Sequence, residues 1–435
     1  MRKFLLMIVV ALLTACSGDE GAQNQVAECS NTGQKQFVLD VMLDWYLWND
    51  LLPANVDISA YASPEELLAF LTTVQPLDNF SFINTLEADT QFFGEGKYEG
   101  YGFGTRFVAA DDLRLTRVFT DSPANTAGLA RGQRILELNG RTIAAIEAAE
   151  GVGAVFDTSP IDFLIRELNG IEFLVTIAVD IVTIDPVPQP PRIILVAGTP
   201  GVGYIEFAQF ISTADAKLDD AFVLFNEAGV TDVIIDMRFN GGGLVNTAEL
   251  LGDYLGGFYA RNLPFSKTLF NADRAANNNT QRDFKNIDLR SLALSRLIII
   301  ASQGTASASE LVINSMEPHV EVTIVGDRTF GKPVGQIGVE FCSKVLRPTA
   351  FQTVNADDFG DYFGGLPADC IVADNLEIAV GADNDPNVEA ALTYLGTGAC
   401  PVAAASLLLS KPAVSAFAAK VDRRGPPQRE YADAY

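Results

Sequence analysis

The chain has 435 residues, among them 30 lysines and arginines and 55 aspartates and glutamates, which give a formal net charge of −25. Hydrophobic residues make up 48% and charged residues 20%, so a disordered chain is excluded, because the apolar material suffices for folded cores. The acidity argues against a nucleic-acid partner, and the single histidine, His319, excludes a metal site with two histidine ligands.

Residues 1–16 have the pattern of an export signal. Arg2 and Lys3 precede an apolar stretch at 4–13, which is about half as long as a membrane-spanning helix. The segment Leu13-Thr14-Ala15-Cys16 resembles a bacterial lipobox. The resemblance implies cleavage before Cys16, acylation of its thiol, and a lipid anchor in the outer membrane of a bacterial cell envelope, facing the periplasm. Simple secretion is the alternative.

Four further cysteines follow: Cys29, Cys342, Cys370 and Cys400. An even number in an exported chain indicates disulfides, and four cysteines allow three pairings. Spacing along the chain favours Cys342–Cys370, which leaves Cys29–Cys400 to tie the ends together. A zinc site is not expected, because no two of these cysteines stand within a few residues of each other.

The length indicates two or three domains, at about 150 residues each. A polar tether at 17–35 precedes a helical N-terminal domain at 36–96. Its first helix is expected from the apolar spacing after Gln36, and its second, at 63–73, from the start signal Ser63-Pro64-Glu65.

From 97 to 185 the pattern changes to short strands and glycine turns, including Tyr101-Gly102-Phe103-Gly104 and a tight Asn139-Gly140 turn. The order of these elements, with a helix expected near 160–168 and a strand at 173–182, resembles a PDZ domain. The resemblance implies that backbone N–H groups of Tyr101, Gly102, Phe103 and Gly104 hold the terminal carboxylate of a peptide. The alternative is that these glycines only make turns.

A proline-rich linker at 186–199 leads to a core at 200–400, in which strands and helices alternate, and a low-complexity tail follows at 401–435. Apolar runs predict strands at 203–207, 232–237, 297–301 and 322–325, and helices are expected at 212–228 and 307–315. This alternation is typical of an α/β domain with buried strands.

Ser307 falls at the start of the helix at 307–315, directly after a buried strand and a turn of small residues. The helix dipole can stabilise a developing negative charge there. Ser307 and Glu310 also have the spacing of an ordinary capping box, which is the structural alternative.

A serine nucleophile needs a base. His319 follows Pro318 beyond the helix and is expected to lie in a loop, so the candidate is Lys332, which stands among glycines and close to Phe330. A lysine acts as a base only when it is neutral, which requires burial. The alternative is an ordinary surface lysine.

Three segments together resemble the C-terminal processing peptidases, also called tail-specific proteases: 304–310 around Ser307, 326–336 around Lys332, and the glycine loop at 236–243. Three positions depart from the usual residues of that family without removing a reacting group: Phe239, Gly241 and Pro333.

The resemblance implies that Ser307 is the nucleophile, Lys332 the general base and Gln336 the residue that orients the lysine amine. It also implies an oxyanion hole made by the N–H groups of Ala308 and Gly242.

The implied fold class is multidomain α/β, with a small helical N-terminal domain, a PDZ-like β-rich domain and a crotonase-like α/β protease core in which Asp236 and Arg238 form a structural ion pair. The implied activity is that of a serine endopeptidase that recognises unfolded or tagged protein substrates by their C-terminal tails and needs no metal or organic cofactor. The PDZ-like domain is expected to keep the site misarranged until a tail binds. A peptide-tail-binding lipoprotein without catalysis and an acyl-CoA enzyme are the alternatives, and a homo-oligomer stays open.

Overall fold

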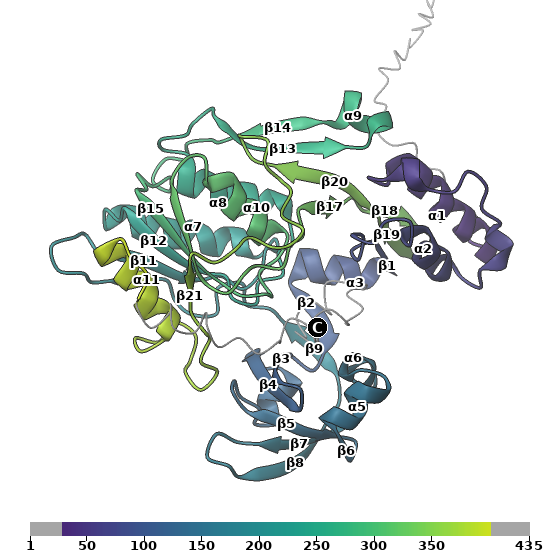
Figure 1. The fold of residues 1–435 in the computed structure, drawn as a ribbon, viewed down its shortest axis with the longest axis horizontal. Coiled ribbons are helices and arrows are strands. Elements are labelled where there is room, and N and C mark those ends of the chain that lie inside the picture. The colour runs from purple at the N-terminus through teal and green to yellow at the C-terminus, as the bar shows by residue number, and fades with distance from the viewer. Residues whose placement is uncertain (1–27, 402–435) are drawn as a thin grey trace, which may run out of the picture.

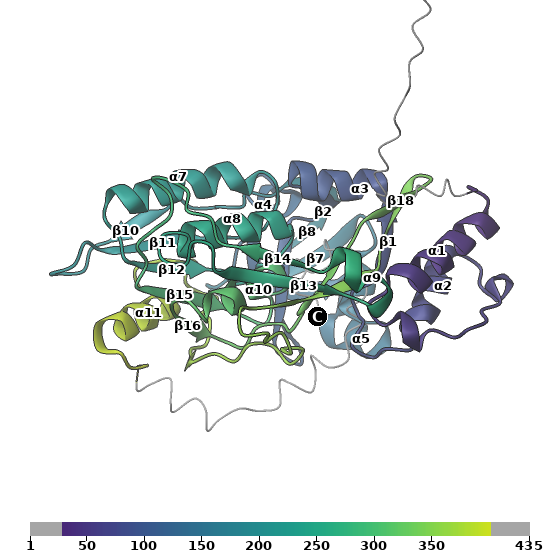
Figure 2. The same cartoon turned by 90° about the horizontal axis from the view of Figure 1, so that it is seen from above.

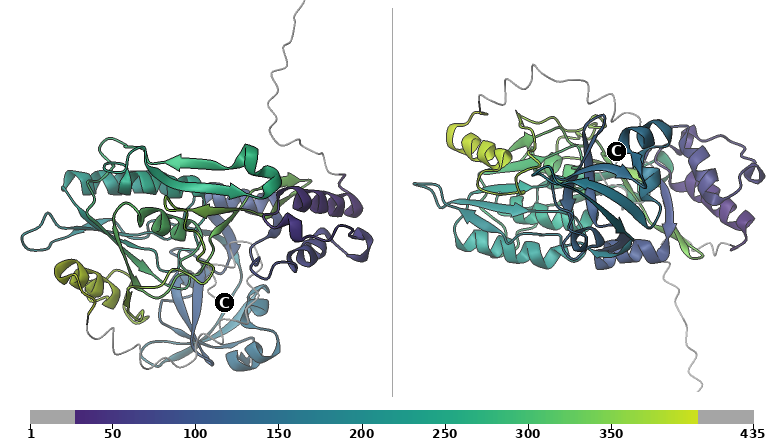
Figure 3. Two further views of the ribbon diagram at one scale, coloured as in Figure 1. Left: turned by 45° about the horizontal axis from the view of Figure 1, so that its top comes forward. Right: turned by 90° about the horizontal axis from the view of Figure 1, so that it is seen from below.

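The computed structural model describes residues 28–401 (Figure 1). The predicted export signal with Cys16 and the tail beyond 401 lie outside the described residues. Within 28–401, none of the helices combines the length and apolar character that crossing a membrane requires. A helical domain and a β-rich domain contact a larger α/β core at separate places (Figures 1 and 3).

The helical domain contains α1 (Asn31–Trp45), the 3₁₀ turns η1 (Asn49–Leu51) and η2 (Ile58–Ala60), and α2 (Pro64–Thr72). Helix α2 begins where the sequence predicts, because the Ser63 hydroxyl accepts the Glu66 N–H at 3.2 Å. Helix α1 begins before Gln36, so the end of the predicted tether at 17–35 is helical and not extended.

Short sheets connect this domain to the rest of the protein. Strand β1 (Phe82–Thr85) pairs antiparallel with β19 (Lys344–Arg347), which pairs with β18 (Val339–Phe341). Helix α3 (Leu86–Thr90) and the π-helical turn η3 (Gln91–Glu95) lead to β2 (Lys97–Gly100), which pairs with β9 (Asp180–Thr183). The pairing of β1 with β19 brings the end of the helical domain against the core.

The β-rich domain has its own hydrophobic core. Its sheet has the order β3-β4-β5-β7-β8, with β6 beside β5. The elements are β3 (Phe103–Ala109), β4 (Asp112–Val118), α4 (Pro123–Thr126), β5 (Arg134–Leu138), β6 (Arg141–Thr142), α5 (Ile143–Ala149), α6 (Val152–Phe156), β7 (Ile161–Arg166) and β8 (Glu172–Ile177).

The helix predicted near 160–168 is wrong, because β7 occupies that segment. Ile161, Phe163 and Ile165 are buried while Asp162 between them is exposed. This alternation has the period of a strand and buries one face of β7.

The α/β core is built on a six-stranded sheet of order β10-β11-β12-β15-β16-β21. Its strands are β10 (Arg192–Ile194), β11 (Val202–Glu206), β12 (Asp232–Asp236), β15 (Arg296–Ala301), β16 (Glu321–Gly326) and β21 (Cys370–Ile371). All neighbours from β11 to β21 are parallel, and β10 is antiparallel at the edge. Because β10 falls at 192–194, part of the predicted linker at 186–199 belongs to the core sheet.

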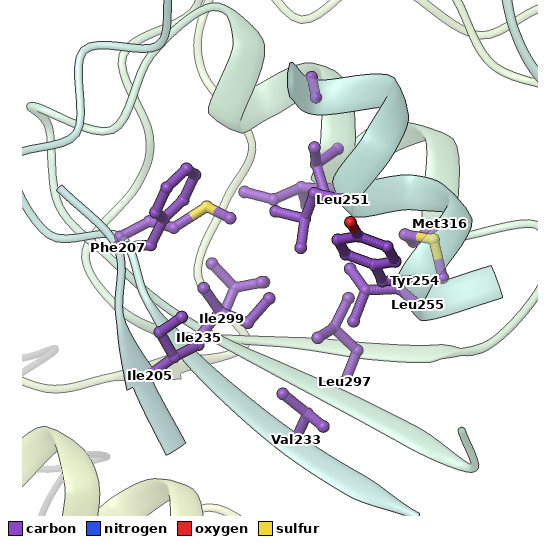
Figure 4. Close-up of a cluster of buried hydrophobic side chains, with 14 of the residues drawn as sticks. Ile205, Phe207, Val233, Ile235, Leu251, Tyr254, Leu255, Leu297, Ile299 and Met316 are labelled. Carbon is purple, nitrogen blue, oxygen red and sulfur yellow. The ribbon is translucent and has the colours of Figure 1, made fainter. Parts of the chain in front are cut away.

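Helices cover both faces of this sheet. The side chains of α7 (Ala214–Glu227), α8 (Val245–Gly256) and α10 (Ala308–Met316) pack on one face, where Ile235, Leu251 and Met316 belong to one hydrophobic cluster (Figure 4). Helix α11 (Pro386–Thr397) covers the other face (Figure 2). With both faces covered, the interiors of β12 and β15 are continuous apolar runs, as the sequence predicts, and the carboxyl ends of these strands lead into the two loops of the candidate site.

A second sheet of order β14-β13-β20-β17 lies beside the core. It contains β13 (Pro264–Phe270), β14 (Thr280–Asp283), β17 (Val334–Gln336) and β20 (Thr349–Val354), with α9 (Ala272–Asn278) between β13 and β14. Strand β17 carries Gln336, which pairs with Thr349 on β20.

The predicted disulfide pairing, Cys342–Cys370 with Cys29–Cys400, is wrong. Cys29 is bonded to Cys342 and Cys370 to Cys400, with Cα atoms 5.8 Å and 5.3 Å apart. The first bond ties the start of the helical domain to the turn between β18 and β19, and the second ties β21 to the segment after α11. Spacing along the chain misled here, because tertiary packing brings both pairs together.

Candidate active site

The turn that carries Ser307 joins β15 to α10. Ser307 adopts φ 56° and ψ −114°, a strained conformation for a residue with a side chain, which costs about 1–3 kcal/mol. Hydrogen bonds from both sides of the serine hold the turn, since the Ala306 N–H and the Ser309 hydroxyl each donate to Asn240 O at 3.0 Å. The turn is therefore fixed against the glycine loop that follows β12.

The carboxylate of Glu310 joins the serine turn to the lysine segment. Its Oε2 accepts the N–H of Ser307 at 2.9 Å and the N–H of Lys332 at 2.8 Å. Its Oε1 accepts the N–H of Gly331 at 2.7 Å and the hydroxyl of Thr329 at 2.5 Å. Burial raises the pKa of Glu310 to about 7, and these hydrogen bonds oppose the rise because they favour the ionised form. Glu310 thus makes the expected capping contact with Ser307 and also binds the backbone of the segment that carries Lys332.

Lys332 is buried, with 7% of its surface exposed. Its Nζ lies 5.1 Å from the centre of the Phe80 ring, which comes from the segment between α2 and β1. Gln336 is in contact with the same residue, since its Nε2 donates to Phe80 O at 2.8 Å. The lysine is therefore not the ordinary surface residue that the sequence left open.

The glycine loop after β12 lies directly against the serine. A Cβ added at Gly242, whose φ is 97°, would stand 2.7 Å from Ala308 N and 2.8 Å from Ser307 Cβ, so only glycine fits. The Gly242 N–H donates to Asn240 Oδ1 at 2.9 Å. This N–H is turned to a side-chain acceptor, whereas Gly241 lines the cavity described next.

A cavity of about 300 Å³ lies at the meeting point of these segments. Its wall contains Ser307, Lys332 and Gln336 together with glycines of two loops and several apolar or aromatic side chains. The full lining is Phe82, Phe93, Gln209, Gly241, Gly243, Leu244, Val245, Asn246, Ser307, Lys332, Gly335, Gln336, Arg347 and Phe351. The cavity has room for a few atoms of a polypeptide beside the serine.

Arg238 forms the predicted ion pair with Asp236 and binds two further carboxylates as well, those of Asp374 and Asp385. It is 1% exposed and lies 2.5 Å from Asp236, 2.7 Å from Asp374 and 2.5 Å from Asp385. Although burial acts against its charge, these carboxylates raise the pKa of Arg238 well above its usual value. A buried arginine with three acidic partners keeps the strand end and the loop in one arrangement.

The same ionic network reaches the β-rich domain. Arg131, which follows α4, donates to Asp374 Oδ1 at 2.6 Å, the oxygen that also accepts from Arg238. The Arg131 guanidinium lies 5.8 Å from the centre of the Phe239 ring in the glycine loop. A second contact joins Arg117 of β4 to Glu206 of β11 at 2.7 Å. Arg131 therefore contacts a carboxylate that also binds Arg238, and Arg117 contacts the end of β11 in the core sheet.

Comparison with known proteins identifies the family. Residues 201–358 match the sequence model of peptidase family S41, and residues 33–82 match that of the peptidase S41 N-terminal domain. Residues 201–358 therefore form a domain of peptidase family S41. The resemblance to C-terminal processing peptidases predicted from the sequence is confirmed at the level of the family.

Curated relatives in family S41 cover parts of the chain. The carboxyl-terminal-processing protease of Synechocystis sp. is 27% identical over 227 residues, 51% of this chain and 50% of that protein. The chloroplastic C-terminal processing peptidase of Tetradesmus obliquus is 31% identical over 144 residues, 32% of this chain and 28% of that protein. The chain thus spans half the length, or less, of these two relatives.

Two solved S41-type structures share the fold. A putative S41 protease from Bacteroides fragilis superimposes with a TM-score of 0.64 at 23% identity, over 83% of this chain and 97% of that chain. The photosystem II D1 C-terminal processing protease gives 0.53 at 18% identity, over 80% and 94%. The architecture is therefore that of a multidomain α/β protein with a helical N-terminal region and an S41 core.

The S41 core brings together most of the site residues predicted from the sequence. Ser307, Lys332 and Gln336 line one cavity, and Ala308 begins α10 beside Gly242. His319 lies elsewhere, with Nε2 2.9 Å from Pro264 O.

The predicted carboxylate loop lies in the β-rich domain and not at this cavity. Tyr101 and Phe103 point into the core of that domain, and Gly102 adopts φ 85° against Ser122. Sequence reasoning missed Phe80 and the clamping role of Asn240. No motif marks Phe80, whereas Asn240 stands inside a recognised segment.

Proposed function

We propose that this protein is a serine endopeptidase of the C-terminal processing type that acts on exported proteins. The observation that carries the proposal is that Ser307, Lys332 and Gln336 line one cavity. This cavity lies at the edge of the sheet where loops follow the carboxyl ends of β12 and β15. A protein that only binds peptides has no use for a buried lysine beside a strained serine. Family S41 membership supports the same reaction class.

In the proposed reaction the Ser307 hydroxyl attacks the carbonyl carbon of a peptide bond while the neutral amine of Lys332 takes the hydroxyl proton. The tetrahedral intermediate collapses when the C–N bond breaks and the lysine returns the proton to the leaving amine. Water then attacks the acyl-enzyme with the same amine as base, which releases the carboxylic acid and regenerates the serine. Gln336 orients the lysine amine throughout.

The negative oxygen of each intermediate is bound by backbone N–H groups. Ala308 supplies one, since it is the first residue of α10 and points its N–H out of the helix end. The glycine loop supplies the other, with Gly241 lining the cavity in place of the Gly242 expected from the sequence. Loss of one such donor typically lowers kcat by about 10²–10³.

The β-rich domain is proposed to be PDZ-like and to bind the C-terminal tail of the substrate through Tyr101, Gly102, Phe103 and Gly104. The contact of its Arg131 with Asp374, which also holds Arg238, supports a role of this domain in arranging the glycine loop. Acylated Cys16 is proposed to hold the enzyme to the outer membrane, where its substrates are unfolded or tagged envelope proteins.

The proposal is tested with the full chain, purified in detergent and mixed with an unfolded protein substrate, with fragments followed by mass spectrometry. Wild type should cleave, and neither Ser307→Ala nor Lys332→Ala should. Tight binding of peptide tails without cleavage would favour the alternative, a tail-binding lipoprotein. Equal cleavage by all three proteins would exclude the Ser307–Lys332 assignment.

A further inference from the structure

The turn between α2 and β1 reaches from the helical domain into the catalytic cavity. Its residue Phe80 is 7% exposed and makes two contacts with the proposed machinery. Its carbonyl oxygen accepts from Gln336 Nε2 at 2.8 Å, and its ring centre lies 5.1 Å from Lys332 Nζ. Lys332 and Gln336 stand 252 and 256 positions from Phe80 along the chain, so only the fold brings them together.

The hydrogen bond to the carbonyl of Phe80 orients the side-chain amide of Gln336. A side-chain amide has a donor end and an acceptor end. Because Nε2 donates to Phe80 O, the acceptor Oε1 is the end left to receive an N–H of the lysine amine.

The ring of Phe80 covers the end of the lysine side chain. It packs against Phe330, with ring centres 6.2 Å apart, so an apolar wall adjoins the amine. The ring therefore shields Lys332 from water and limits its positions.

The turn itself is rigidly held by a second carboxylate. Asp78 Oδ1 accepts the N–H groups of Phe80 and Ser81 at 3.0 and 3.1 Å and the Thr349 hydroxyl at 2.9 Å. The Ser81 hydroxyl accepts the Thr349 N–H at 2.9 Å. Since Thr349 pairs with Gln336 in the second sheet, the turn and the glutamine are fixed to the same strand.

We propose that Phe80 is a positioning residue through which the helical N-terminal domain completes the active site, by orienting Gln336 and covering Lys332. The proposal rests on the function proposed above. It assigns the helical domain a direct part in the arrangement of the catalytic residues.

The test compares Phe80→Ala with Phe37→Ala in the full chain. Phe37 is also 7% exposed in the same domain and stacks on Phe341, so its loss removes similar packing without touching Lys332. We expect Phe80→Ala to lower kcat about 100-fold with KM within about threefold of wild type, and Phe37→Ala to lower only the melting temperature. Phe80→Leu, which keeps an apolar cover, should stay within about tenfold of wild type.

A further measurement separates positioning from folding. Phe80→Ala keeps the backbone carbonyl that accepts from Gln336 Nε2, so this variant tests the cover that the ring forms over Lys332. In a Ser307→Ala background, acetic anhydride should modify Lys332 several times faster when Phe80 is alanine than when Phe37 is, as read by peptide mass spectrometry.

Equal kcat losses in Phe80→Ala and Phe37→Ala, with equal modification of Lys332, would overturn the proposal. If wild type shows no cleavage that depends on Ser307, the proposed function fails instead, and the labelling experiment still decides whether Phe80 covers the lysine.

Discussion

Glu310 accepts the backbone N–H of Lys332 at 2.8 Å, and the same oxygen accepts the N–H of Ser307 at 2.9 Å. The two residues proposed to exchange a proton are thus set relative to each other by one buried carboxylate, through their backbones. The arrangement makes Glu310 a positioning residue whose replacement should affect turnover more than binding.

Glu310→Gln tests this positioning. An amide keeps the size of the side chain but presents an NH₂ group to two of the donors, so either the Oε1 or the Oε2 partners lose their acceptor. We expect kcat to fall about 100-fold with little change in KM, measured with the unfolded substrate. Glu321→Gln, at the exposed start of β16, serves as the control and should leave kcat unchanged. Equal activity of wild type and Glu310→Gln would contradict the positioning role.

The raised pKa of Glu310 also predicts how stability depends on pH. Burial raises this pKa from 4.5 to about 7, so the folded chain holds the proton more tightly than the unfolded chain. The resulting contribution to the free energy of unfolding is fully present below pH 4.5 and is lost as the pH rises through about 7. Relative to Glu310→Gln, wild type should lose about 3 kcal/mol of stability across that window. Urea unfolding of both proteins at several pH values measures the difference, and a flat difference would refute it.

Arg131 is the place to test communication between the β-rich domain and the glycine loop. Arg131→Ala removes the domain's contact with Asp374, while Arg238 keeps its three carboxylates. We expect cleavage of a substrate with a free C-terminal carboxylate to fall about tenfold, towards the rate for the same substrate with an amidated C-terminus.

The control for Arg131 is Arg134→Ala. Arg134 pairs with Asp111 and Asp112 inside the β-rich domain and should be neutral in this comparison. A parallel loss of rate on both substrates would show that Arg131 supports folding and does not transmit tail binding.

The two disulfides lie in different parts of the fold, so their removal should have different effects on turnover. Replacing Cys29 and Cys342 by serine should lower stability by about 2–4 kcal/mol and also lower kcat, because this bond anchors the domain that carries Phe80. Replacing Cys370 and Cys400 by serine should lower stability to a similar degree without lowering kcat, since that bond lies on the far face of the core sheet. Melting temperature and kcat of both double variants check the contrast.

How far the sequence predicts the place of a residue differs from one residue to the next, for physical reasons. Ser307 and Lys332 were predicted because each stands in a short segment whose glycines and small residues are local requirements of a turn. Strands β12 and β15 were predicted because burial on both faces imposes an unbroken apolar run. Such turns and buried strands depend on residues that are neighbours in the sequence, so the sequence alone predicts them.

The disulfide pairing, the role of Phe80 and strand β10 could not be predicted, because each depends on contacts between segments that are distant in the sequence. Cys29 finds Cys342 over a separation of 313 residues, and Phe80 meets Gln336 over 256. The sequence predicts a linker where β10 lies, because the apolar residues of this strand follow prolines and precede a turn. Only pairing with β11 makes it part of the sheet.

Gly242 offers the most direct test of the glycine loop. A methyl group there would stand 2.7 Å from both Ala306 O and Ala308 N, so the serine turn and the loop have to separate. Gly229→Ala is the matched control, because Gly229 also has a positive φ, 69°, but nothing lies within 4 Å of the added carbon.

In both variants the alanine has to adopt a positive φ, which destabilises the fold by about 1 kcal/mol. Both melting temperatures should therefore fall, and this contribution to the fall should be the same in the two variants. Only Gly242→Ala should lose kcat, by at least about 100-fold, because only there does the methyl group displace the backbone around Ser307 and Ala308. If the two variants retain equal turnover, the glycine loop does not shape the oxyanion site, and the donor has to be sought outside the residues that follow β12.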